Sequence, residues 1–140
     1  MFDYVKHCNA RRLSKAKSIF ELSQCIKQKP LQKKNFLTLA KKFEFTDNQS
    51  ARILGMSLRT FRKKNPVSDL SVHASEMVIR LSELYEIGIE TFNNSQSFII
   101  WLDSICIPLN NHKPAMLIES GIGIKLVKDE LLMKQFRALT

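Results

Sequence analysis

The side chains best suited to specific chemistry lie in one short basic segment of the chain. Arg59 and Arg62 carry planar guanidinium groups, which can donate paired hydrogen bonds to the edge of a guanine base. Lys63 and Lys64 suit phosphate oxygens, contacts that position a protein on DNA without reading its sequence. The segment therefore predicts binding of double-stranded DNA. The predicted DNA-binding residues are Ser57, Leu58, Arg59, Thr60, Arg62, Lys63 and Lys64.

The spacing of the residues around this segment is typical of a helix-turn-helix. Ala51 is the small residue needed where two helices press together, and Gly55 can take the positive φ of a tight turn. Met56 fills the gap below the turn, and Phe61 gives the second helix an apolar inner face. The pattern predicts that residues 57–64 form the recognition helix. An ordinary pair of antiparallel helices is the alternative.

Apolar residues recur at helical spacing on both sides of this motif. An amphipathic helix is expected over residues 14–28, a capping box at residues 46–49, and the longest helix over residues 71–92. Gly121 and Gly123 open a last helix that holds Ile124, Val127, Leu131 and Leu132. Gly and Pro are scarce, four of each, which disfavours a chain rich in tight β-turns. We expect an all-α fold of seven or eight helices without a sheet.

The positive charge of the chain is concentrated in its first half. Residues 1–64 hold 16 Lys and Arg against 4 Asp and Glu, a net charge of +12. Residues 65–140 hold 6 against 9, a net charge of −3, and the two halves account for the total of +9. Such asymmetry indicates a polyanionic partner for the front half and a different partner for the back half.

Nothing in the sequence forms a catalytic or metal-binding constellation. Three Cys (Cys8, Cys25, Cys106) and three His are scattered at spacings that match no paired metal ligands. We expect the cysteines to be separate reduced thiols. There is no nucleophile–base pair, paired-carboxylate signature or Gly-rich phosphate loop. We therefore predict no catalytic, metal-binding or cofactor-binding residues and no small-molecule substrate, and an enzyme is disfavoured.

The sequence also predicts a cytoplasmic protein without a membrane partner. The longest apolar run, from Phe98 to Leu102, is far shorter than the roughly 18 apolar residues that a membrane span needs. The N-terminal residues do not have the apolar core of a signal peptide.

Beyond the basic segment, a series of short motifs follows in a fixed order. They are Ser57-Leu58-Arg59-Thr60-Phe61-Arg62, Leu70-Ser71, Arg80-Leu81, Glu83-Leu84-Tyr85, Trp101-Leu102, Pro108-Leu109, Lys113-Pro114, Met116-Leu117, and then Ser120, Gly123, Val127 and Leu131. From Phe36 to Leu132 the chain thereby resembles the Xre-type antitoxins that are encoded beside RES-domain toxins. The last motif is similar to that family's Thr-x-x-Gly-x-x-x-Val-x-x-x-Leu pattern, with Ser in place of Thr.

The resemblance implies a toxin–antitoxin pair. In such pairs a RES-domain toxin consumes nicotinamide adenine dinucleotide or uses it as an ADP-ribosyl donor, and the antitoxin blocks its active site largely through the C-terminal domain. The helix-turn-helix domain commonly forms a homodimer and represses the pair's own operator. The toxin-binding residues predicted on this basis are Trp101, Lys113, Lys134, Gln135, Phe136, Arg137, Ala138, Leu139 and Thr140.

Two segments depart from the family's usual pattern. Asn110-Asn111-His112 stands where the family has Gly-Gly, so we expect this loop to differ in shape. The residues from Leu132 to Arg137 replace the family's Gly-Arg-Ile-Glu-x-Gly tail with a basic, apolar version. We expect residues 134–140 to form a tail that follows the last helix and enters the toxin's pocket.

These features together predict three parts of the chain. Residues 1–30 form an N-terminal helical extension, residues 31–66 the helix-turn-helix DNA-binding domain, and residues 67–140 a toxin-binding domain with a dimerising helix. The alternative is a solitary helix-turn-helix transcriptional regulator without a toxin partner. In that case the C-terminal domain only dimerises or senses a ligand.

Overall fold

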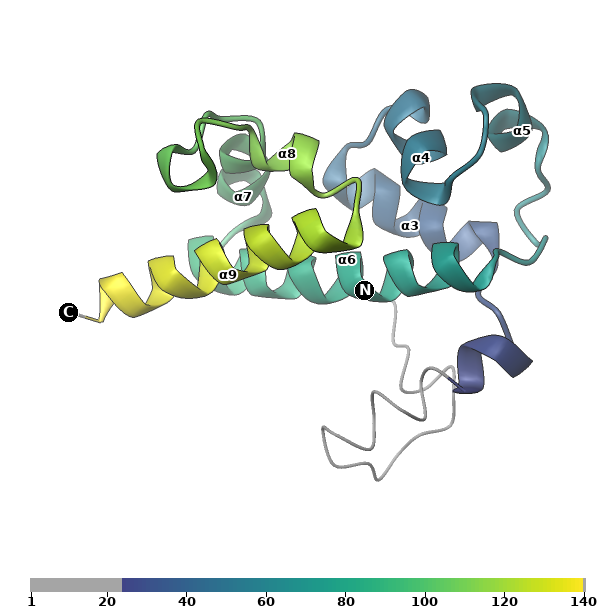
Figure 1. Ribbon diagram of the computed structural model, residues 1–140, viewed down its shortest axis with the longest axis horizontal. Coiled ribbons are helices and arrows are strands. Elements are labelled where there is room, and N and C mark those ends of the chain that lie inside the picture. The colour runs from purple at the N-terminus through teal and green to yellow at the C-terminus, as the bar shows by residue number, and fades with distance from the viewer. Residues whose placement is uncertain (1–23, 140) are drawn as a thin grey trace. The chain divides into compact units, whose positions relative to one another are not determined.

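A computed structural model of the chain describes residues 24–139, and the regular secondary structure of these residues is helical (Figure 1). The helices are α3 (Lys33–Phe43), α4 (Asp47–Leu54), α5 (Leu58–Lys63), α6 (Val72–Phe92), α7 (Ser95–Leu102), the 3₁₀ helix η1 (Ile107–Leu109), α8 (Pro114–Leu117) and α9 (Gly121–Ala138). Within residues 24–139, β-structure is limited to two isolated bridges, so the predicted all-α fold is confirmed. Residues 24–28 are helical, and the rest of the helix expected over residues 14–28 lies outside the described range. None of the described helices has the length and apolar character needed to cross a membrane.

Local capping residues set the boundaries of α4 and α5. The Thr46 hydroxyl accepts from the Gln49 N–H at 3.2 Å, and the Gln49 side chain accepts from the Thr46 N–H at 3.0 Å. The predicted capping box is therefore present. Gly55 ends α4 with φ of 70°, the left-handed conformation in which a side chain is strained. Ser57 then caps α5 by accepting from the Thr60 N–H at 3.1 Å.

The chain divides into two compact units, and the boundary between them along the sequence falls within α6, between Ile79 and Arg80. In the first unit, the segment after α5 returns to the start of α3. The Leu70 N–H donates to Leu31 O at 2.7 Å, and the Lys33 N–H donates to Ser68 O at 3.0 Å. These hydrogen bonds fix both ends of the segment that contains the helix-turn-helix.

Aromatic rings fill the centre of the first unit. Phe36 is completely buried, with the Phe61 ring edge-on at 6.3 Å and the Phe45 ring stacked at 6.4 Å. Phe36 comes from α3 and Phe61 from α5, so this contact joins the recognition helix to the core. The other buried apolar residues of this unit include Leu31, Leu39, Phe43, Ala51, Ile53, Leu54, Leu70, Ala74, Met77 and Val78.

In the second unit, α9 runs parallel to residues 80–92 of α6 (Figure 1). Lys128 pairs with Glu83 at 2.7 Å, and the Gln135 amide donates to the Thr91 hydroxyl at 2.8 Å. Both pairs advance in the same direction along the two helices, which fixes their register. The core of this unit includes Leu81, Leu84, Tyr85, Phe98, Leu102, Ile118, Ile124, Val127 and Leu131.

The start of α9 lies unusually close to the end of α8. A Cβ added to Gly123 would stand 1.6 Å from Leu117 O, whereas a Cβ added to Gly121 would meet nothing within 4 Å. Ser120 caps α9 at this point by accepting from the Gly123 N–H at 3.0 Å. Gly123 is therefore required by the close backbone approach, and Gly121 is not.

Substitution of these two glycines tests the close approach. We expect Gly123→Ala to lower the free energy of unfolding by about 2 kcal/mol or more, because the Leu117 carbonyl must move. Gly121→Ala serves as the matched control and is expected to be neutral or stabilising by up to about 1 kcal/mol. Chemical denaturation followed by circular dichroism measures both. Equal stability of the two variants would contradict the observed packing.

Candidate DNA-binding helix and partner-binding surface

The recognition helix α5 buries one face and exposes the other. Phe61 and, on α4, Ala51 are buried where the two helices meet. Met56 is half-buried, and its N–H donates to Ala51 O at 3.0 Å, which closes the turn. These residues occupy the positions that the sequence pattern assigned to them. Of the predicted DNA-binding residues, Leu58 and Lys64 are half-buried, and Ser57, Arg59, Thr60, Arg62 and Lys63 are exposed.

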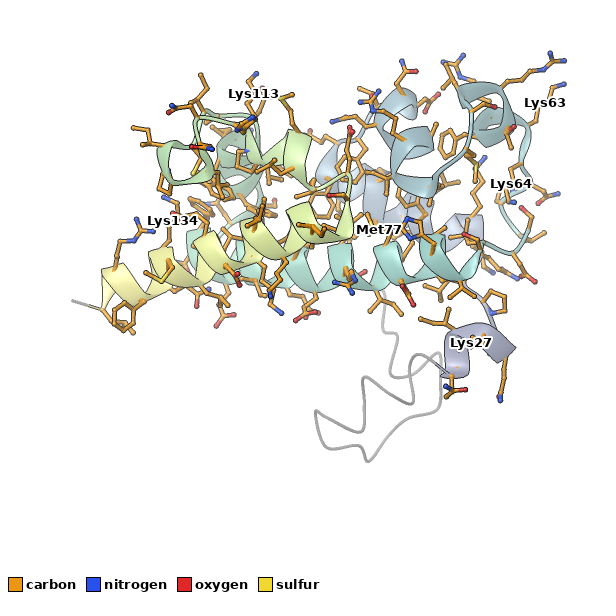
Figure 2. All side chains as sticks on the ribbon, in the orientation of Figure 1. Lys27, Lys63, Lys64, Met77, Lys113 and Lys134 are labelled. Carbon is orange, nitrogen blue, oxygen red and sulfur yellow. The ribbon has the colours of Figure 1, made fainter. Side chains whose placement is uncertain are left out.

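Some of the exposed side chains at α5 already form hydrogen bonds within the protein. The Ser57 hydroxyl donates to the Thr60 hydroxyl at 2.8 Å as well as capping the helix, so these two side chains fix its first turn. Lys63 and Lys64 lie at the C-terminal end of α5 (Figure 2). The outer face of α5 therefore begins with side chains that hydrogen-bond to each other and ends with positively charged ones.

Arg62 forms an ion pair with Asp47, the first residue of α4. Arg62 Nε lies 3.2 Å from Asp47 Oδ2. The contact engages Nε, so it does not require the two Nη groups at the far end of the guanidinium. Both side chains are more than half exposed, which keeps the pair accessible to a ligand.

Lys33 caps the C-terminal end of the recognition helix from inside the protein. Lys33 is only 5% exposed, and its ammonium donates to Phe61 O and, at 2.8 Å, to Lys64 O. The ammonium also lies 4.5 Å from the centroid of the Phe61 ring. A cation is stabilising at this end of a helix because the last carbonyl groups are unpaired there. The sequence pattern did not indicate Lys33, since a lysine among many basic residues resembles a solvated one.

Removal of this internal cap should weaken the first unit. We expect Lys33→Met, which keeps the aliphatic stem, to lower the free energy of unfolding by about 2–3 kcal/mol, because two carbonyl groups lose a charged donor. Lys34→Met is the matched control: it neutralises the adjacent, exposed lysine and should change stability by less than about 0.5 kcal/mol. Thermal and urea unfolding of both variants give the comparison. A similar loss in both would argue against a capping role for Lys33.

The second unit places Trp101 partly in its core. The indole is half-buried, with the Phe92 ring at 5.6 Å and the Phe98 ring at 6.3 Å. Lys134 Nζ lies 5.8 Å from the Trp101 ring, so these two predicted toxin-binding residues lie together. Lys113 instead pairs with Asp103 at 3.5 Å and is half-buried. Figure 2 shows the two lysines on different elements, with Lys113 directly before α8 and Lys134 in α9.

The expected C-terminal tail is part of α9, which corrects the sequence-based interpretation. The helix continues to Ala138, because Gln135 bonds to Thr91 and Arg137 pairs with Glu130 at 2.7 Å. The Glu130 side chain is 8% exposed, so Arg137 neutralises a buried carboxylate. Lys134, Gln135, Arg137 and Ala138 also line an open hollow beside residues 90–92. Phe136 and Leu139 are exposed, and Thr140 lies outside the described residues.

A row of exposed apolar side chains runs along α9. It consists of Ile122, Leu126, Met133 and Phe136, flanked by Leu132 and Leu139. The spacings of four, seven and three residues keep the row on one face of the helix, and the exposed Asp129 interrupts it. The buried residues Ile124, Val127 and Leu131 lie on another face. We call Ile122, Leu126, Met133 and Phe136 the α9 row. Only Phe136 among them was predicted from the sequence to contact a partner, because a helix that is apolar on two faces does not reveal which face is covered.

The loop that departs from the usual Gly-Gly pattern has a backbone that suits its asparagines. Asn110 and Asn111 both have φ of 61°. This left-handed conformation is favourable for Gly and is tolerated by Asn better than by most other residues. The loop is closed by the Cys106 N–H, which donates to His112 O at 3.1 Å. Two asparagines are therefore compatible with a turn of this kind.

The cysteines differ from the expected set of reduced thiols. Cys25 is disulfide-bonded, which corrects that expectation, whereas Cys106 is a free, buried thiol. Cys8 lies outside the described residues. Among residues 24–139, no three His, Cys, Asp or Glu side chains gather as they would around a metal ion.

Comparison with known proteins bears on the first unit and the start of the second. Residues 29–83 match the family model of the antitoxin Xre-like helix-turn-helix domain. The matched range covers less than half of the 140 residues and includes α3, α4, α5 and every predicted DNA-binding residue. No curated protein matches the chain. The helix-turn-helix prediction is confirmed, and the match supports the resemblance to Xre-type antitoxins.

Proposed function

We propose that this protein is an antitoxin that binds a RES-domain toxin and represses its own operon. The similarity of residues 29–83 to the antitoxin Xre-like helix-turn-helix domain carries this proposal. The protein acts by binding, and the consumption of nicotinamide adenine dinucleotide belongs to the toxin. An operator-binding protein of this kind acts in the bacterial cytoplasm.

The DNA partner is double-stranded operator DNA, bound through α5. Arg59, Arg62 and Lys63 are exposed on this helix, which lies in the half of the chain with a net charge of +12. Cations in such a position attract phosphates, and guanidinium groups can read guanine in the major groove. A six-residue helix offers few base contacts, so a homodimer on a two-fold operator is the expected binding form.

Two substitutions in α5 separate base reading from phosphate contact. Arg62→Ala should lower the preference for the operator over unrelated DNA by about tenfold or more, because a bidentate base contact is lost. Lys63→Ala should instead weaken binding to all sequences alike and reduce the salt dependence. Fluorescence anisotropy with operator and scrambled duplexes at several salt concentrations measures both effects. An unchanged preference in Arg62→Ala would remove Arg62 from its proposed role.

The toxin partner is proposed to bind the second unit along the α9 row and the end of α9. Four apolar side chains on one helical face remain in contact with water, and burial of such surface drives protein association. Lys134, in the last turns of this helix, and the half-buried Trp101 beside it lie on another side of α9 and offer a cation and an aromatic ring as a second contact. The proposed occupant is the toxin's active-site face.

A pair of equally exposed residues tests this surface. Phe136 on α9 is 61% exposed and Met116 on α8 is 63% exposed, so replacing either by Ser should leave the unit folded. We expect Phe136→Ser to weaken toxin binding by about tenfold or more and Met116→Ser to have little effect. The assays are co-purification with the RES protein encoded in the adjacent reading frame and inhibition of its dinucleotide consumption. Loss of inhibition in Met116→Ser alone would place the contact on α8 instead.

The regular spacing of the α9 row also favours a second candidate function, a solitary regulator. Apolar residues separated by three, four or seven positions are typical of helices that pair with each other. In that case two copies of α9 would form a homodimer, and no toxin would be needed. Both candidates allow a homodimer, so the Phe136→Ser variant distinguishes them in sedimentation. Its conversion into a monomer would support the solitary regulator, whereas a retained dimer with weakened toxin binding would support the antitoxin.

A further inference from the structure

We infer that Asp47 determines DNA specificity by holding the Arg62 guanidinium in its base-reading orientation. This inference rests on the proposed binding of DNA through α5. It concerns a residue that belongs to the first helix of the helix-turn-helix and does not lie on the recognition helix. Asp47 is therefore a positioning residue, which acts on DNA through Arg62.

The two helices supply a rigid frame for this ion pair. Asp47 is the first residue of α4, directly after the Thr46–Gln49 capping box that fixes the start of that helix. Arg62 lies in the last turn of α5, whose end is held by Lys33. Because both backbones are fixed, the 3.2 Å contact between Asp47 Oδ2 and Arg62 Nε fixes the direction of the guanidinium as well.

The engaged atom leaves the base-reading end of the guanidinium available. A carboxylate that accepts from Nε lies along the edge formed by Nε and one Nη group, and it leaves open the other edge, which is formed by the two Nη groups. These two groups form the fork that can donate to O6 and N7 of guanine. Orientation of the side chain before DNA binds also reduces the conformational entropy lost on binding. The carboxylate also offsets the repulsion between the Arg62 guanidinium and the like charge of Arg59, one turn earlier on the same helix.

The exposure of the pair argues against a mainly structural role. The Arg62 and Asp47 side chains are 62% and 55% exposed, and ion pairs this open to solvent contribute little to stability. An acidic residue beside a DNA-binding helix also opposes the approach of phosphates. A carboxylate at this position therefore carries an electrostatic cost for binding any DNA, which specificity can offset.

Because of this cost, a role as a mere charge and a role in orienting Arg62 predict opposite changes in affinity for the preferred sequence when the carboxylate is removed. Simple neutralisation of a carboxylate near DNA should raise the affinity for every sequence. If Asp47 orients Arg62, Asp47→Asn should instead lower the affinity for the preferred sequence while leaving the affinity for scrambled DNA unchanged or higher. The ratio of the two affinities is thus more informative than either affinity.

The experiment uses the full chain and a duplex that it selects from a random library. We expect Asp47→Asn to lower the ratio of selected to scrambled affinity by about threefold, with a melting temperature close to that of the wild type. Asp47→Glu, which keeps the carboxylate, should restore part of the ratio. Glu44→Gln is the matched control, because it removes an equal charge from an exposed residue of the same unit and should leave the ratio unchanged. In an Arg62→Ala background, Asp47→Asn should have no further effect on the ratio.

Three outcomes would overturn the inference. Equal rises in both affinities would show that Asp47 acts only as a charge. A fall in the ratio that persists in the Arg62→Ala background would show that Asp47 acts through something other than Arg62. A wild-type chain that selects no preferred duplex would overturn the proposed DNA-binding function itself, and with it this assignment.

Discussion

The position of the recognition helix depends on one buried cation. A helix of six residues is too short to be stable by itself, and its last carbonyl groups have no partners within the helix. Lys33 supplies those partners from α3 while its ammonium rests against the Phe61 ring. The burial of an ammonium is costly unless its donors are satisfied, so this contact also restricts the arrangements that α3 and α5 can adopt. The orientation of Arg62 and the neighbouring cations follows from that restriction.

The positive charges of the first half of the chain therefore have different uses. Lys33 is internal and holds a helix, Arg62 is paired with Asp47, and Arg59 and Lys63 are exposed on the recognition helix. The formal charge of the segment does not distinguish these roles. A net charge of +12 describes attraction to a polyanion at long range, whereas in the proposed complex the geometry of a few side chains would decide which base sequence is preferred.

Features set by neighbouring residues could be predicted from the sequence, and features set by distant residues could not. The capping box at Thr46 and Gln49 and the turn at Gly55 depend on contacts within a few positions, so their residue types indicate them directly. The contact of Lys33 with Phe61 spans 28 positions and depends on how α3 packs against α5. The end of α9 was misjudged for the same reason, because Gln135 is held by Thr91 across 44 positions. A segment that lacks a helix-stop signal continues as a helix where such contacts support it.

The division of α9 into two faces has an evolutionary consequence. Ile124, Val127 and Leu131 pack in the unit's own core, where a change of shape disturbs the fold. The α9 row lies on another face, where a change of side chain costs the unit little of its own stability. If the α9 row binds a partner as proposed, selection can alter that affinity one outward residue at a time while the fold is preserved. One helix would then allow related chains to diverge in their partners without first having to evolve a new scaffold.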